Sequence, residues 1–498
     1  MDDDRRFSGI VGIVGSGKGI YILGVFFMNI GLARSMGTEV FGSFQQVFMF
    51  SALFTVLTLG IPETMYFFLP RLTAEERPGF LGQTLVMLGL NGFLNALVLW
   101  IAAPSLAGIQ GNPEIVTSIR VFGLYGAFLI VSSFADPVFI TFRRLGYLFV
   151  LSGVHGLVFI LLTVWQYMTK ADIFSMFAAI AFFGLVKLIV SVVLVYRMRA
   201  EIGPISFFGA RPSLLLQLSY SIPIAMSTTI EVVSKWLDKF VVSFYFGPQA
   251  LGIFYVGAIE IPLVNLLLSS VYSVASPVLN KLHHDNDTAG FADFINKMLE
   301  FTAKLIWPLF IYLIFFAGHL IPLVFKSDFL PAVVPFRVYL LMMPVRIALY
   351  GVIIIALGRS VFVFWGSFGA MVLNLVLNIL LVRQLGFIGP AIATVISTYL
   401  HVVFFVVIIL KLMKVRLGDI LPVRAFIDIG LSSMVAVSVA ILLTWSFSSD
   451  LKITILSLSI FSGTYIILGL KAGFITIPNF GGMKKGGGRG GRNDSQYN

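Results

Sequence analysis

The residues best suited to chemistry in this sequence are ionisable groups within long apolar segments. Four of them recur in one segment at spacings of three and four residues, namely Glu231, Lys235, Asp238 and Lys239. At about 100° per residue they fall within about 100° of one helix face. Such groups are costly at membrane depth and usually face a protein interior or a water-filled cavity. The face predicts a wall of a central polar cavity or a structural ion-pair network, and the two interpretations are compatible.

Other apolar segments hold further charges of both signs. The predicted spans together contain about three more basic than acidic residues. Because Lys and Arg pair with phosphate, this excess favours an anionic ligand. The residues predicted to bind it are Lys18, Lys187, Lys235, Lys239 and Arg346. Those predicted to couple to an ion, or to form internal ion pairs, are Glu63, Glu231, Asp238 and Glu260.

The scaffold that carries these residues is predicted to be an all-α polytopic membrane protein. Hydrophobic residues make up 58% and charged residues 11% of 498, whereas a soluble domain has about 25% charged residues. Apolar runs of about 20 residues favour spanning helices over β-barrel strands of about 10 alternating residues. About fourteen spans are expected, at 11–33, 42–69, 80–104, 117–141, 147–168, 173–196, 214–245, 250–279, 299–324, 331–356, 361–382, 387–410, 425–446 and 453–474.

The distribution of basic residues predicts the orientation. With the N-terminus inside, the inside segments hold 21 of the 34 Lys and Arg residues. The outside loops hold only Arg34, Lys170, Lys326, Arg383 and Lys452. We therefore expect a multi-pass protein of the cell (cytoplasmic or inner) membrane with both termini in the cytoplasm.

The connections argue against a separate catalytic domain. The longest, at about 197–213 and 280–298, hold roughly 20 residues, so the protein is not expected to be an enzyme. The absence of cysteine excludes disulfides and thiolate sites. No cofactor or metal site is predicted, and His283 and His284 are expected in a solvated loop. The basic, Gly-rich tail is expected near anionic membrane lipid, with no nucleic-acid partner.

An internal repeat divides the chain. The pattern G-x-x-x-x-G-x-F occurs at 37–44 and again at 247–254, an offset of 210 residues. Six predicted spans separate the copies, so the halves should share one topology. In this register Asn29 corresponds to Lys239. We expect six-helix lobes at 1–205 and 206–415, two added helices at 416–474, and a cytoplasmic tail at 475–498.

Prolines interrupt several predicted spans. Pro62 precedes Glu63, Pro344 lies two residues before Arg346, and Pro223 and Pro262 lie in spans 7 and 8. Proline removes a backbone hydrogen bond and bends a helix. These positions predict bends next to charged residues, as expected where a transporter changes shape or where kinked helices pack.

Four short segments carry a resemblance to a known family. They are residues 33–42, 59–63, 237–252 and 386–394, which include Gly37, Gly42, Pro62, Glu63, Asp238, Lys239, Gly247 and Gly252. Each resembles the matching part of polysaccharide flippases of the multidrug/oligosaccharidyl-lipid/polysaccharide exporter superfamily. The resemblance covers spans 1 to 12.

The resemblance implies two lobes that form a V around a central cavity and expose it to each side in turn. It implies that a polyprenyl-pyrophosphate-linked oligosaccharide crosses to the outer leaflet for synthesis of O-antigen, capsule or exopolysaccharide. It also implies a coupling ion, H⁺ or Na⁺. Related alternatives are a lipid II flippase and a multidrug or cation antiporter of the same superfamily. A membrane glycosyltransferase or ligase is a further alternative, and a purely structural role would follow if the charges all pair internally.

Overall fold

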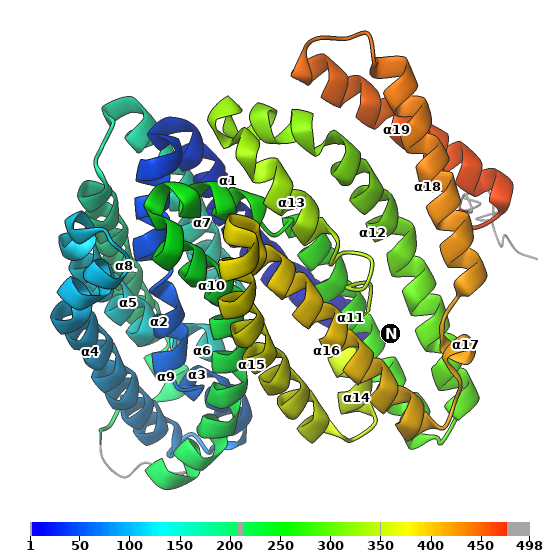
Figure 1. Ribbon diagram of the computed structural model, residues 1–498. Coiled ribbons are helices and arrows are strands. Elements are labelled where there is room, and N and C mark those ends of the chain that lie inside the picture. Colours follow the sequence, from blue (N-terminus) through cyan, green and yellow to red (C-terminus); the bar gives the residue numbers. More distant parts are fainter. Residues whose placement is uncertain (1, 208–212, 349, 476–498) are drawn as a thin grey trace, which may run out of the picture.

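Helices are the only regular secondary structure in the residues that the computed structural model describes, namely 2–207, 213–348 and 350–475 (Figure 1). The side chains of residues 2–16 and of Lys18 lie outside this description. Apolar runs form helices because a helix satisfies its own backbone hydrogen bonds in lipid. The first half contains α1 (Asp2–Phe48), α2 (Ser51–Leu57), α3 (Ile61–Phe68), η1 (Leu69–Arg71), α4 (Arg77–Ile109), η2 (Pro113–Ile115), α5 (Val116–Ser132), α6 (Ala135–Thr141), α7 (Leu145–Thr169), α8 (Ile173–Arg197) and α9 (Arg199–Ile202).

The second half has the same mixture of long and broken helices. It contains α10 (Leu214–Gly257), α11 (Pro262–His284), α12 (Thr288–Phe325), η3 (Ser327–Ala332), α13 (Val333–Leu340), α14 (Tyr350–Ala356), α15 (Ser360–Leu385), η4 (Gly386–Ile388), α16 (Gly389–Met413), α17 (Leu417–Ile420), α18 (Val423–Thr444) and α19 (Asp450–Ala472). His283 and His284 end α11, so the expected polar loop is shorter than predicted. The predicted lobe boundaries at 205 and 415 stay predictions.

Eleven stretches of the described chain are long and apolar enough to cross a membrane. This establishes a multi-pass, all-helical membrane protein, whereas the exact count of fourteen is not confirmed. The stretches at Gly19–Arg71 and Ser360–Met413 contain 53 and 54 residues. A straight helix of that length would measure about 80 Å, against about 30 Å of hydrocarbon. Each of these stretches therefore contains a reversal.

Two glycines reverse the chain in the same way. Gly37 in α1 has φ 76° and ψ 176°, and Gly247 in α10 has φ 77° and ψ −171°. A positive φ is easily adopted only by glycine, which explains the residue at both positions. Asn29 accepts a hydrogen bond from Gln45 at 2.7 Å across the first reversal. The matching motifs at 37–44 and 247–254 are thus two hairpins with one backbone shape.

The two hairpins pack against each other reciprocally. A Cβ atom on Gly42 would lie 1.7 Å from the Pro248 carbonyl oxygen, and one on Gly252 would lie 2.2 Å from the Thr38 carbonyl oxygen. Thr38 and Pro248 are themselves related by the offset of 210 residues. No side chain fits at either glycine, so the spacing of the repeat specifies the contact between the two halves.

Helix α10 joins the halves at both of its ends. Near the Gly247 reversal, the Gln46 amide donates to Ser243 Oγ at 2.9 Å. Toward the start of α10, the buried Gln217 amide donates to the hydroxyls of Thr64 and Thr84 at 3.0 and 3.2 Å. Figure 1 shows α10 between the α4, α5 and α8 group and the α15 and α16 pair. Hydrogen bonds thus connect α10 to the first half at two places, near Ser243 and at Gln217.

Several predicted spans are broken rather than continuous. The expected span 42–69 consists of the end of α1, α2 and α3, with Leu59 and Gly60 at φ 51° and 65°. The expected span 331–356 ends as a helix at Leu340 and resumes at α14. Pro62 and Pro262 lie at the first turns of α3 and α11, where no amide donor is needed. Pro223, by contrast, lies inside the continuous part of α10.

The last two long helices form a hairpin at one edge of the molecule. Figure 1 shows α18 and α19 beside α12, on the opposite edge from α4 and α5. The Tyr465 hydroxyl of α19 donates to the Lys304 carbonyl oxygen of α12 at 2.9 Å. Tyr312 and Ser457 Oγ are 3.1 Å apart. These contacts hold the hairpin on the second half alone.

Candidate functional site

The charged face predicted on α10 is present, and it divides into two ion pairs. Lys235 Nζ lies 2.8 Å from Glu231 Oε1, and both side chains are more than half exposed. One turn further, Lys239 Nζ lies 3.2 Å from Asp238 Oδ1, and these side chains are 13% and 3% exposed. The face therefore has an accessible end and a buried end, which can serve different purposes.

The buried end is a polar cluster built by four helices. The Asp238 carboxylate accepts hydrogen bonds from the Tyr339 hydroxyl of α13 and from the Lys239 amide at 2.7 Å. Thr394 Oγ1 of α16 lies 3.4 Å from Asp238 Oδ2. The Asn374 amide of α15 donates to Thr394 at 3.2 Å. Four helices thus place hydroxyl and amide groups around one buried carboxylate.

The cluster also contains an unused acceptor. Asn378 donates to Asn374 Oδ1 at 2.9 Å, while its own Oδ1 is buried and has no hydrogen-bond partner. Sequence inspection missed Tyr339, Thr394 and both asparagines. The signal was present in Asn374 and Asn378, two amides spaced four apart in an otherwise apolar helix.

The accessible end gathers charges from two helix breaks. Glu260 lies between α10 and α11, and Arg346 lies between α13 and α14. Electrostatic interactions link Glu260 with Lys235, Lys239 and Arg346. The Glu260 carboxylate also accepts from the Asn265 amide at 2.9 Å. Six of the predicted site residues therefore come together: Glu231, Lys235, Asp238, Lys239, Glu260 and Arg346.

This cluster contains three cationic and three anionic side chains. The positive excess counted along the sequence is therefore absent at this place. Lys235 and Lys239 each have a carboxylate partner within 4 Å. The Arg346 side chain is exposed and has no hydrogen bond or salt bridge to the described residues. Arg346 therefore differs from the two lysines, because it interacts with Glu260 only through space and makes no direct contact with that carboxylate.

The remaining predicted residues form a second group in the first half. Lys187 on α8 interacts electrostatically with Asp136 on α6, and it lies near His155 on α7. Glu63 and Asp136 both lie near Tyr66. No interaction with the α10 cluster is found for Lys187 or Glu63 in the part of the chain that the structure describes. Lys18, the fifth predicted basic residue, lies outside the described side chains.

The described residues contain no group of three His, Cys, Asp or Glu side chains that could hold a metal ion. An oxygen-rich site of the kind around Asp238 is a different arrangement, because hydroxyls and amide carbonyls supply most of its oxygens. Such oxygens suit a proton or a hard monovalent cation better than a transition metal.

Comparisons with solved structures show the fold. The lipid II flippase MurJ in an inward closed conformation superposes with a TM-score of 0.70 at 18% identity, over 91% of this chain and 96% of that one. An inward-facing multidrug resistance transporter of the MATE family and MOP superfamily gives 0.61 at 15% identity, over 81% and 95%. A MOP superfamily transporter from Pyrococcus furiosus gives 0.56 at 14% identity, over 82% and 96%.

The family follows from the sequence profile that matches the chain. Among curated proteins, no match was found. The profile of the polysaccharide biosynthesis protein family matches residues 31–334, which is more than half of the chain and includes both glycine hairpins. With its all-helical fold, shared with transporters of the MOP superfamily, this chain belongs to the polysaccharide biosynthesis protein family.

Proposed function

We propose that this protein moves a polyprenyl-pyrophosphate-linked oligosaccharide across the cell membrane for surface polysaccharide synthesis. Arg346 carries the proposal, because its guanidinium is exposed, makes no direct salt bridge to the described residues and lies close to Lys235. A guanidinium binds phosphate oxygens in a two-pronged geometry that an ammonium cannot provide. The pyrophosphate would bind Arg346 and Lys235, the sugar would follow the polar face of α10, and the lipid tail would remain in the bilayer.

The family and the structural neighbours support a transporter of this kind. One neighbour is named as a flippase of lipid II, and others as multidrug transporters. The Pyrococcus furiosus protein is described as having a binding pocket of reverse polarity, which suggested a different function. Pocket polarity is therefore a sound criterion within this fold, and the exposed cation at Arg346 favours an anionic cargo.

A cation antiporter is the second candidate. It is favoured by Glu231, whose side chain is 66% exposed beside Lys235. A cationic drug could pair with this carboxylate and displace Lys235. The two candidates differ in which member of the accessible end contacts the substrate, so substitutions at Arg346 and Glu231 separate them.

The Asp238 cluster supplies a candidate for ion coupling. Its buried carboxylate contacts the hydroxyls of Tyr339 and Thr394 from two other helices, and Asn374 of a third helix donates to Thr394. Binding of H⁺ or Na⁺ at Asp238 would compete with Lys239 and so change how α10 packs on α13 and α16. Asp238→Asn should leave cargo binding intact and remove the dependence of transport on an ion gradient.

The test of the function is charge reversal at Arg346. Arg346→Glu should abolish surface polysaccharide in a cell that depends on this protein, while the amount of protein in the membrane is unchanged. Arg346→Lys should retain part of the activity because it keeps the charge but loses the two-pronged geometry. Arg359→Glu, an exposed change in the next connection, is the matched control and should be silent. Normal polysaccharide with Arg346→Glu, or altered drug efflux instead, would replace the proposal with the antiporter.

A further inference from the structure

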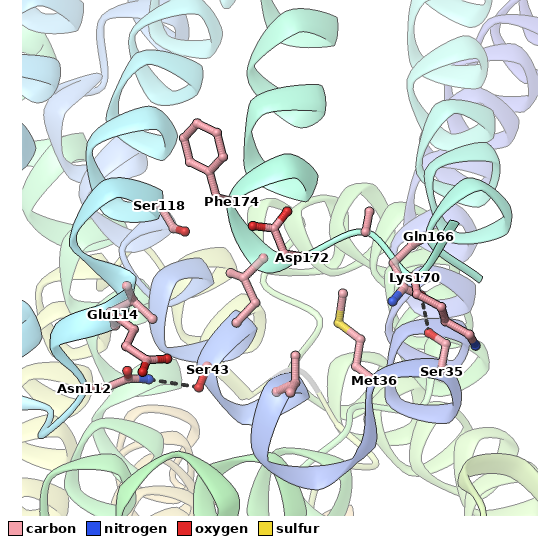
Figure 2. A pocket seen from close by; sticks show the side chains of 14 residues that line it. Ser35, Met36, Ser43, Asn112, Glu114, Ser118, Gln166, Lys170, Asp172 and Phe174 are labelled. Atoms are coloured by element: carbon pink, nitrogen blue, oxygen red, sulfur yellow. Dashed lines mark hydrogen bonds between the residues drawn. The ribbon is translucent and has the colours of Figure 1, made fainter. Parts of the chain in front are cut away.

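A hollow of about 450 Å³ lies at one end of the first-half helices, away from the α10 cluster. It is formed where the reversal of α1, the η2 connection and the α7–α8 connection meet (Figure 2). Its volume falls within the range of about 300–1,000 Å³ that is typical of small-molecule sites. The connections around it contain Arg34 and Lys170, two residues of the loops predicted to lie outside the membrane.

The lining of the hollow combines the groups that recognise sugars. Glu114 and Asp172 supply carboxylates, Gln166 supplies an amide, and Phe174 supplies an apolar ring. Carboxylates and amides accept and donate hydrogen bonds to neighbouring hydroxyls, and a ring can pack on the apolar face of a sugar. Figure 2 shows Ser118, Glu114 and Asn112 on one side of the hollow and Gln166, Lys170 and Ser35 on the other.

Ser118 places a hydroxyl without a partner among the described residues at the wall of the hollow. Its side chain is 3% exposed, lines the hollow and makes no hydrogen bond within the described part of the chain. In Figure 2 its hydroxyl points from α5 into the space on the side of Asp172. A hydroxyl that faces a hollow without a protein partner can donate to and accept from a ligand or water there. Glu114 likewise has no side-chain partner among the described residues.

Asn112 connects the hollow with the contact between the two halves. Its amide donates to Ser43 Oγ at 2.9 Å and to Gln46 Oε1 at 2.7 Å. Gln46 in turn donates to Ser243 of α10, and Ser243 donates to Gln110 Oε1 at 3.0 Å. The buried chain of hydrogen bonds therefore runs from the wall of the hollow to the second half of the molecule.

Building on the proposed function, we infer that this hollow binds a hexose-sized sugar unit of the glycan on the outer face. Glu114, Ser118 and Asp172 would bind the sugar hydroxyls, and Asn112 would turn from Gln46 toward the ligand. Binding would then loosen the polar contact between Gln46 and Ser243. The glycan could reach the site as part of the lipid-linked cargo or as free saccharide outside the cell.

The site can be measured on purified full-length protein because the native chain contains no cysteine. Ala171→Cys places one thiol at the rim of the hollow, and its reaction with a water-soluble maleimide reports occupancy. Free hexoses and N-acetylhexosamines at millimolar concentration should slow labelling about threefold or more, as expected for one weakly held ring. Ser327→Cys, on an exposed connection elsewhere, should label at the same rate with and without sugar.

Two substitutions test the residues that line the hollow, and a third tests the hydrogen-bond connection from the hollow to α10. Glu114→Gln and Ser118→Ala should each remove the protection of Ala171→Cys by sugar. Gln46→Ala, which does not line the hollow, should lower the half-protecting sugar concentration about threefold because it frees Asn112. An unchanged concentration in Gln46→Ala would overturn the connection to α10.

The source of the glycan follows from a second arm of the same assay. Protection by free sugar identifies a site open to saccharide outside the cell, whereas protection only by lipid-linked oligosaccharide in the same vesicles identifies crossing cargo. Failure of both, or equal protection by small organic cations, would overturn the sugar site. If flipping continues while no glycan protects Ala171→Cys, the site is refuted and the proposed function stands. Loss of transport in Arg346→Glu bears on the function alone.

Discussion

The two glycine hairpins have the same backbone and opposite chemistry. Gly37 and Gly247 differ by 1° in φ, from 76° to 77°. In the first hairpin Asn29 and Gln45 form a neutral, buried amide pair. At the position that matches Asn29, the second hairpin carries Lys239, paired with the buried Asp238. The scaffold is thus duplicated, whereas at this matching position an ion pair stands in the second hairpin and a neutral amide in the first.

The difference between the two hairpins lies in their side chains and not in their backbone, and it places the ionic cluster in the second copy. The amide pair of the first hairpin carries no charge, and its Gln45 Oε1 is buried without a hydrogen-bond partner among the described residues. In the second copy, Glu260 and Arg346 enter from helix breaks and add charges that α10 alone would not have. A repeated scaffold can therefore carry a neutral polar contact in one copy and an ionic cluster in the other.

The largest expected effect on stability and transport is at Lys239, the position where the two hairpins differ most in charge. Lys239→Met should destabilise the protein by about 3 kcal/mol or more and abolish transport, because it leaves the Asp238 carboxylate buried without its cation. Asn29→Met should cost about 1 kcal/mol and leave transport measurable. Thermal unfolding in detergent and a cellular polysaccharide assay would measure both.

A double substitution separates structure from coupling at this pair. Lys239→Met combined with Asp238→Asn should recover most of the stability, since no charge is then buried alone. It should not recover transport that depends on an ion gradient. Full recovery of both would mean that the pair is structural only and that the second copy has no special role.

The next largest effect on stability is expected at Gly42 and Gly252, where the two hairpins contact each other reciprocally. Gly42→Ala and Gly252→Ala should each cost about 1–3 kcal/mol, because a Cβ would overlap a backbone carbonyl oxygen of the other hairpin. The two losses should be similar, as the contact is reciprocal. Gly89→Ala in α4 is the control, since its Cβ would meet nothing within 4 Å. A harmless change at one of the two hairpin glycines would show that the halves do not meet symmetrically.

The smallest effect on stability is expected at Asp172, an ionised residue that caps a helix at the edge of the first half. Asp172 caps α8 by accepting from the Ser175 amide at 3.1 Å. Hydrogen bonds from Ser175 hold the pKa of Asp172 below its ordinary value of 3.8. Asp172→Ala should therefore cost about 1 kcal/mol near neutral pH.

The pH dependence of this cap has a definite sign. Because the folded pKa is lowered, the stabilisation is present above the ordinary pKa and is lost as pH falls through the folded value. The difference in unfolding free energy between the native protein and Asp172→Ala should hence become smaller below about pH 4. Asp172→Asn keeps an acceptor and is the control. A difference that stays constant down to pH 3 would show that the charge of Asp172 does not contribute.

Local sequence signals predicted the helices, the hairpin glycines and the charged face of α10. Gly37 and Gly247 could be found because a required positive φ leaves a recognisable residue. Nearby prolines suggested the helix breaks beside Glu260 and Arg346. Proline alone does not locate a break, however, because Pro223 lies inside the continuous part of α10. The partners of Asp238 could not be derived, because Tyr339 and Thr394 lie 101 and 156 residues away and meet it only through helix packing.

The positive excess counted along the sequence was also misleading for the same reason. A count over spans treats Lys187 and Arg346 alike, yet Lys187 interacts with Asp136 in the first half, whereas Arg346 lies with Glu260 in the charge-balanced cluster at α10. Only the arrangement in space shows which charges lie near opposite charges.

The most direct test of the central claim is transport of two cargoes that differ only in charge. Purified protein in vesicles would be offered the same oligosaccharide on a polyprenyl pyrophosphate and on an uncharged polyprenyl carrier. The pyrophosphate-linked cargo should cross at least about tenfold faster, and Arg346→Glu should remove this preference, a difference of about 1.4 kcal/mol in the barrier. Equal rates for the two cargoes, or a preference that survives Arg346→Glu, would contradict recognition of an anionic cargo at Arg346.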